Sequence, residues 1–174
     1  LDFITLDSLM PLLLYALNQT VTDKNMEKKY HRDLEYRLLN GSLAEAEEED
    51  VANLLRLGLT EDYRVITCYL KPENYKDNFT ASQRKKMEDI EKAILDIVPK
   101  EYAYCNMNQV ICIHKENRKE GKLDLRKKLE EFQRMIQDQL KEGKSEYEFL
   151  IGVGNKVKGY HNLKESFADS KIAI

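Results

Sequence analysis

The sequence is short of cysteine, proline and glycine and has no tryptophan at all. Its 174 residues include three cysteines, three prolines and seven glycines. The cysteines, Cys68, Cys105 and Cys112, are odd in number and show no close-paired spacing, which argues against a disulfide framework. We therefore expect a reducing, cytoplasmic setting.

The sequence also lacks an apolar stretch long enough to cross a membrane. Its densest apolar run, Leu9 to Leu17, is well below the roughly 20 residues that a spanning helix needs. The first residues do not have the charged-then-apolar order of a secretion signal. Three glycosylation triplets, at 18–20, 40–42 and 78–80, are therefore interpreted as chance matches. No membrane partner is expected.

Neither sign of charge dominates. Lysine and arginine total 28, aspartate and glutamate total 31, and the net charge is −3. A DNA-binding domain normally has a basic excess on one face, so direct DNA binding by this chain is disfavoured. The length suits one well-buried domain with some excess, but not two. The chain starts at Leu1 without methionine, and a helical pattern is still running at Ile174. We expect it to be part of a longer protein.

Residues 1–41 predict a long N-terminal helix. It has an apolar face in its first half, formed by Met10, Leu13, Leu14, Leu17 and Val21. The pattern lapses at 22–25, resumes at Met26, and ends before Gly41, a favourable C-terminal cap. A helix of roughly 45 Å, at about 1.5 Å per residue, is longer than a small domain needs. The face therefore indicates a dimerising or signal-transmitting helix. The alternative is an ordinary helix lying on its own domain.

Capping patterns, turn residues and apolar periodicity divide residues 42–174 into further elements. In chain order we predict helix 44–57, strand 63–70, a helix between 80 and 99, strand 102–105, strand 110–114, a helix between 122 and 143, strand 147–153 and a helix from 161. The two middle helices carry the apolar stripes Met87, Ile90, Ile94 and Ile97, and Leu125, Leu129, Phe132, Ile136 and Leu140.

The order of these elements predicts a fold class. Strand 110–114 is apolar on both faces, which is typical of a central strand covered on both sides. From 63 onwards the order is strand, helix, strand, strand, helix, strand. This is the α+β, ferredoxin-like βαββαβ arrangement, with an antiparallel sheet. Helices 44–57 and 161–174 are available to cover the second face of the sheet.

Four short motifs resemble a known family. They are Leu38-Leu39-Asn40-Gly41-Ser42, Leu55-Arg56-Leu57-Gly58-Leu59, Gly152-Val153-Gly154 and Ser166-Phe167-Ala168-Asp169-Ser170. Their order and spacing are similar to the central GGDEF-like domain, with its preceding helix, of PucR/CdaR-type bacterial transcriptional regulators. Asp169 stands where that pattern favours glutamate, and Ser170 where it favours alanine.

The resemblance implies a palm-like domain at 42–174, preceded by a dimerisation helix at 1–41, in a cytoplasmic regulator that acts as a homodimer. An upstream region would sense a small-molecule effector, whose identity the sequence does not give. A downstream helix-turn-helix region would bind DNA, and neither region is in this chain. On this interpretation the domain is a non-catalytic coupling module without a cofactor or metal.

The alternative is a nucleotide-binding sensor or an active nucleotide cyclase of the GGDEF type. Such enzymes need carboxylates that hold metal ions against phosphates, on the first strand and at the hairpin turn. Strand 63–70 has no acidic residue, and the turn reads Asn106, Met107, Asn108 and Gln109. Amide side chains do not replace the missing charge, so we interpret the turn as a degenerate cyclase turn.

Two weaker patterns have an ordinary packing interpretation beside the functional one. Cys105, Cys112 and His114 share one predicted sheet face, but zinc takes about four ligands and a fourth is not evident. Buried thiols that pack as small hydrophobes explain them equally well. Gly152-Val153-Gly154 precedes a helix but completes no nucleotide fingerprint, so we do not expect a phosphate loop.

Overall fold

The computed structural model describes residues 26, 29–72, 81–97, 102–106, 108–116, 122–142 and 147–174. The chain divides into two compact units, residues 1–37 and 38–174. Residues 29–39 are helical, and Gly41, whose φ is +63°, follows the end of this helix as predicted. The predicted dimerisation face, Met10, Leu13, Leu14, Leu17 and Val21, lies outside the described residues.

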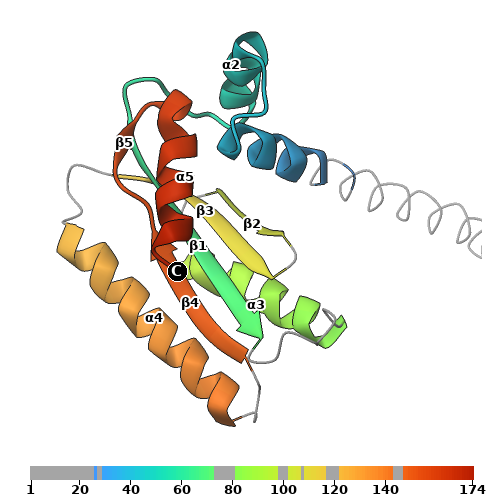
Figure 1. The fold of residues 1–174 in the computed structure, drawn as a ribbon, viewed down its shortest axis with the longest axis vertical. Coiled ribbons are helices and arrows are strands. Elements are labelled where there is room, and N and C mark those ends of the chain that lie inside the picture. The colour runs from blue at the N-terminus through green and yellow to red at the C-terminus, as the bar shows by residue number, and fades with distance from the viewer. Residues whose placement is uncertain are drawn as a thin grey trace, which may run out of the picture. The chain divides into compact units, whose positions relative to one another are not determined.

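The second unit is mixed α+β, and its elements are labelled in Figure 1. They are α2 (Glu45–Leu54), β1 (Asp62–Pro72), α3 (Ala81–Ile97), β2 (Tyr102–Asn106), β3 (Gln109–Lys115), α4 (Lys122–Glu142), β4 (Tyr147–Val153), β5 (Val157–Lys158), the 3-10 turn η1 (Tyr160–Asn162) and α5 (Leu163–Ile172). No helix among the described residues is long and apolar enough to span a membrane.

The sheet is antiparallel throughout, with the strand order β2-β3-β1-β4. The strand β1 is central, because β3 pairs along one side of it and β4 along the other. The short strand β5 pairs with the first two residues of β1, on the same side as β4. The sheet edges are therefore β2 and the β4–β5 side.

One face of the sheet carries the main core, which α3 and α4 cover (Figure 1). Its buried residues are Ile66, Cys68, Leu70, Met87, Ile90, Ile94, Val110, Cys112, Leu129, Phe132, Ile136, Leu140 and Phe149. The apolar stripes predicted for the two middle helices are thus confirmed where side chains are described; Leu125 is only partly buried, and the side chain of Ile97 is not described.

Helix α5 lies over the opposite face of the sheet (Figure 1) and buries Leu163 and Phe167. On β3, Ile111 and Ile113 are also buried, so the prediction that this strand is covered on both faces is confirmed. The sequence pattern also made helix 44–57 available to cover this face of the sheet. Instead, α2 contacts η1, where His161 Nδ1 lies 3.0 Å from a carboxylate oxygen of Glu48.

Several boundaries differ from the sequence prediction. Helix α2 begins at Glu45 with Ala44 as its N-cap, because the carboxylate of Glu47 accepts the Ala44 backbone N–H at 3.1 Å. The predicted turn at 154–159 contains the strand β5, and the last helix ends at Ile172, where the sequence pattern predicted continuation to the chain end.

Candidate functional site

The predicted cyclase turn is the tight connection between β2 and β3. Asn106 and Gln109 form the last pair of the hairpin, and the carbonyl of Asn108 accepts the backbone N–H of Leu70 at 2.9 Å. The turn therefore lies beside the C-terminal end of β1. Met107 and the side chain of Asn106 are outside the described parts.

The acidic residue of β1, Asp62, lies at the opposite end of that strand from the turn between β2 and β3. Asp62 begins β1 and pairs with Lys158, whereas Tyr69, seven residues later, pairs with Gln109. At about 3.3 Å per residue, Asp62 is roughly 23 Å away from the turn. Among the described residues of β1 and the turn, the only carboxylate, that of Asp62, is thus far from the turn.

A second polar region lies at the other end of β1, where the pairing changes register. Between the pairs Ile66–Val153 and Tyr63–Val157, the three residues 154–156 face only two residues of β1. One extra residue on one strand is a β-bulge, which interrupts the ladder of backbone hydrogen bonds. The sequence pattern did not predict it.

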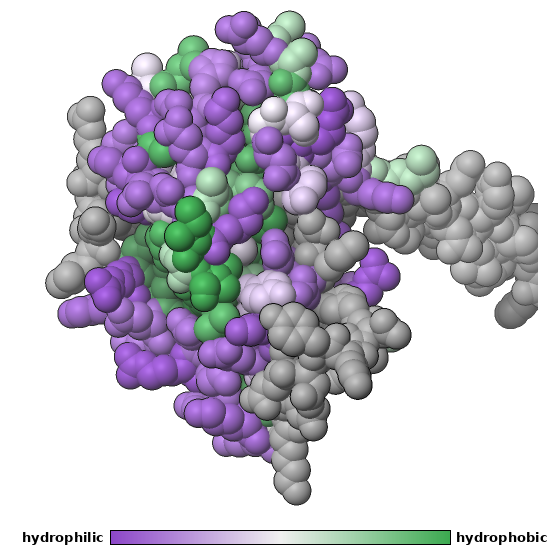
Figure 2. Space-filling view, in the orientation of Figure 1, coloured by the Kyte–Doolittle hydropathy of each residue, from purple (hydrophilic) through white to green (hydrophobic). Residues whose placement is uncertain are grey.

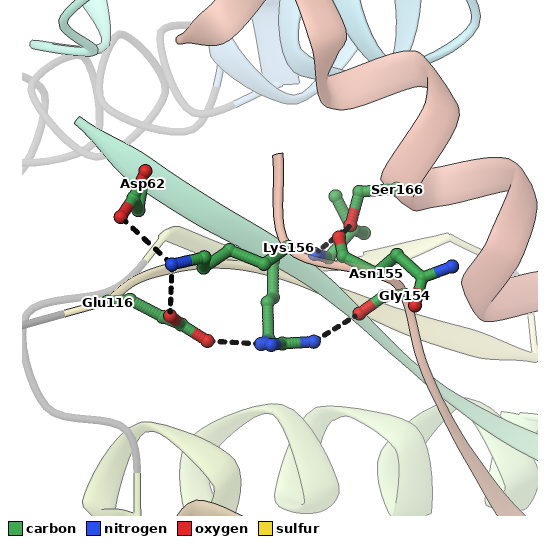
Figure 3. Close-up of polar contacts among 8 residues, drawn as sticks. Asp62, Glu116, Gly154, Asn155, Lys156 and Ser166 are labelled. Carbon is green, nitrogen blue, oxygen red and sulfur yellow. Dashed lines mark hydrogen bonds and ion pairs between the residues drawn. The ribbon is translucent and has the colours of Figure 1, made fainter. Parts of the chain in front are cut away.

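Ser166 of α5 repairs the interrupted ladder (Figure 3). Its hydroxyl accepts the backbone N–H of Val65 at 2.9 Å and donates to the carbonyl of Asn155 at 2.7 Å. On the other side of the bulge, Gly154 N–H donates to the Val65 carbonyl at 2.8 Å. Because unpaired buried backbone groups are costly, Ser166 is a structural component of the sheet.

Two glycines of this region let α5 approach the sheet closely. A Cβ atom on Gly152 would lie 1.9 Å from the Ser170 carbonyl oxygen, and one on Gly154 would lie 1.9 Å from that of Ser166. The hydroxyls of Ser170 and Thr67, both fully buried, are 2.7 Å apart. The Gly-x-Gly pattern therefore serves helix packing.

The bulge also holds a group of ion pairs centred on Arg64 (Figure 3). Arg64 is 8% exposed, pairs with Glu116 through its Nε, and donates from Nη1 to the Gly154 carbonyl at 3.1 Å. Lys156 Nζ lies 3.2 Å from Asp62 and 3.8 Å from Glu116. Each buried or half-buried charge thus has a partner of opposite sign, the arrangement that burial of a charge demands.

Glu61 forms a neighbouring polar contact. Its carboxylate pairs with Lys115 and accepts the hydroxyl of Tyr63 at 2.5 Å. The hydrogen bond from Lys115, and then that from Tyr63, lower the pKa of Glu61 below its ordinary value of 4.5.

We expect Glu61→Gln to lower the free energy of unfolding at neutral pH but not in acid. A depressed folded-state pKa gives stability that is fully present above the unfolded-state pKa, near 4.5, and is lost as the pH falls through the folded value. Urea unfolding at pH 7, 5 and 3 measures this difference. A gap between variant and wild type that widens towards pH 3 would contradict the assignment.

The cysteine and histidine pattern is described only in part. Cys68 and Cys112 are free, fully buried thiols, and burial raises the pKa of the Cys68 thiol. Among the described residues, no group of three or more histidine, cysteine or acidic side chains is placed to hold a metal ion. His114 is buried opposite Arg64 in the register of β1 and β3, while the side chain of Cys105 is not described.

Comparison with protein-family models, curated proteins and solved structures finds no match for this chain.

Proposed function

We propose that residues 42–174 form a non-catalytic domain of ferredoxin-like, GGDEF-like topology that relays a signal in a cytoplasmic transcriptional regulator of the PucR/CdaR type. Residues 1–41 are the dimerisation helix in this proposal. The effector binds upstream, and DNA is bound by a downstream helix-turn-helix region. A change at the helix alters how the two DNA-binding regions of a homodimer pair.

The observation that carries the proposal is the way two of the family-like motifs meet. Gly152 faces Ser170, and Gly154 faces Ser166, at distances that leave no room for a side chain on either glycine. Glycine is therefore needed at positions 152 and 154, because the backbone carbonyls of α5 lie directly against them. The close packing of α5 on the sheet therefore gives a physical reason why the glycine motif and the serine motif occur together in the sequence.

The sheet gives further support for the topology. The strand order β2-β3-β1-β4, with every neighbouring pair antiparallel and helices after β1 and β3, is the arrangement of a split βαβ fold. The turn between β2 and β3 lies beside the end of β1, where a cyclase would hold its metal ions. The turn sequence offers only amides and a thioether there, which supports a non-catalytic role.

A nucleotide assay separates this proposal from the cyclase alternative. The chain is incubated with GTP or ATP and Mg²⁺ or Mn²⁺, the products are separated chromatographically, and nucleotide binding is measured by calorimetry. We expect neither product nor binding heat. A cyclic product would overturn the proposal, and binding without turnover would make this domain the sensor itself.

We expect the chain to sediment as a dimer, at twice 20.4 kDa, at high micromolar concentration in analytical ultracentrifugation. Replacing Leu14 by lysine places a charge on the predicted apolar face and should yield monomers. Asn18→Lys, at a polar position of the same predicted helix, is the matched control and should remain dimeric. A wild-type chain that is monomeric throughout would refute the dimerisation helix.

A further inference from the structure

At one residue of the edge strand β4, Phe149, side chains of α4 form hydrogen bonds with the outward-facing backbone groups. The backbone N–H of Phe149 donates to Gln137 Oε1 at 2.9 Å, and Gln133 Nε2 donates to the Phe149 carbonyl at 3.3 Å. Gln133 and Gln137 are one helical turn apart, so their amides take the place that a neighbouring strand would occupy. At Phe149 the side-chain amides of α4 therefore pair with the strand edge as the backbone of another strand would.

The next outward-facing groups of this edge belong to Ile151 and Val153. Backbone groups point to alternate sides along a strand, so these two residues direct their N–H and C=O the same way as Phe149. Within the described ranges, no hydrogen bond to these outward groups is found. The stripe of α4 that carries the glutamines continues opposite them as Leu129 and Leu125, which offer no polar partner.

A groove of about 430 Å³ opens at this point. Leu125 and Leu129 line one wall, and Ile151 and Val153 line the other. In Figure 2, hydrophobic residues gather around a hollow between α4 and the last residues of the chain. Along this strand the groove runs from Ile151 to Asn155, the length of about four extended residues at about 3.3 Å per residue.

The far end of the groove is lined by two arginines, each of which also pairs with a carboxylate. Arg64 pairs with Glu116, and Arg126 contacts Glu130, which lines the groove as well, at 2.8 Å. Arg64 is nine-tenths buried and uses two of its five N–H groups, towards Glu116 and Gly154. The guanidinium therefore retains donors in the geometry that recognises a carboxylate.

We propose that this groove binds the extended C-terminal segment of another polypeptide, which adds to β4 as a further strand. Its backbone pairs with Ile151 and Val153, and alternate apolar side chains pack against Leu125 and Leu129. Its terminal carboxylate lies at the arginines. Strand addition beside a helix uses main-chain hydrogen bonds for affinity and alternate side chains for specificity. A C-terminus fits better than an internal segment, because Gln133 closes one end of the groove and the unused N–H donors of Arg64 favour a carboxylate at the other.

The probe is a fluorescein-labelled hexapeptide of alternating serine and valine with a free C-terminal carboxylate, titrated with the full 174-residue chain. We expect saturable anisotropy with Kd below about 1 mM. The C-terminal amide of the same peptide should bind about tenfold more weakly, because it loses a charge-assisted hydrogen bond. Arg126→Ala should weaken binding about fivefold, while Arg134→Ala, an exposed arginine of α4 outside the groove, should leave it unchanged.

Amide hydrogen exchange tests the strand pairing itself. Saturation with the peptide should slow exchange at Ile151 and Val153 by about tenfold or more, because their N–H groups gain acceptors. Gly152 N–H, directed towards β1, should not change. Absence of binding at 5 mM peptide overturns the proposal. So does equal affinity of carboxylate and amide, or pentanoate binding as tightly as the peptide, which would make the groove a small-acid site.

Discussion

Replacing Gly152 by alanine is expected to reduce the free energy of unfolding by about 3–5 kcal/mol, the range of severe overpacking. The added Cβ would lie 1.9 Å from the Ser170 carbonyl oxygen and 2.8 Å from Ile174 Cγ1. A backbone carbonyl cannot rotate away as a side chain can, so α5 must shift off the sheet. That shift also breaks the buried hydroxyl contact between Ser170 and Thr67. The Tm of a domain of this size should fall by about 10 °C.

Gly58→Ala is the matched control for this prediction. Its added Cβ would meet only the carboxylate end of the Glu61 side chain, at 3.0 Å, which can move aside. We expect a change below about 1 kcal/mol, measured by urea and thermal unfolding of both variants. Equal losses for Gly152→Ala and Gly58→Ala would show that α5 does not depend on the close approach.

Ser166→Ala is expected to lower the free energy of unfolding by about 2–4 kcal/mol, although it removes only one oxygen atom. The change leaves the buried backbone N–H of Val65 without an acceptor, which costs about 1–3 kcal/mol, and it also removes the hydrogen bond to the part-buried carbonyl of Asn155. Amide exchange at Val65 should accelerate in parallel, because its N–H loses its acceptor. Equilibrium unfolding and exchange measurements on the same variant test both effects.

Ser170→Ala provides the comparison, because its hydroxyl bonds to a side chain and to a carbonyl of its own helix. No backbone group of the sheet loses its partner, so we expect a loss of about 1 kcal/mol. A larger loss for Ser170→Ala than for Ser166→Ala would refute the view that Ser166 completes the backbone ladder.

The sequence predicted those features that depend on local pattern. Strand 147–153 has the bounds that its apolar run indicated, and the stripe from Leu129 to Leu140 is buried as its spacing requires. The hairpin around Asn108 was also located, because a short polar turn between two apolar runs is a local signal. A signal within a single segment was enough for each of these predictions.

Features that depend on how distant segments meet were not predictable in this way. The bulge at 154–156 exists only relative to the register of β1, ninety residues earlier in the chain. Ser166 and the pair Gln133 and Gln137 looked like polar positions on amphipathic helices. Their bonds to the backbone of the sheet depend on which edge each helix meets, and no local pattern encodes this.

The double contact of α5 has a mechanical consequence for any movement that passes through the domain. Ser166 and Ser170 are both bonded to β1, and both lie against glycines that admit no other residue. A slide of α5 along its own axis by one residue would break both attachments and force a larger side chain over a glycine. Intermediate positions along such a slide are therefore unfavourable. We therefore expect a force on α5 to move the helix together with β1 until both attachments break.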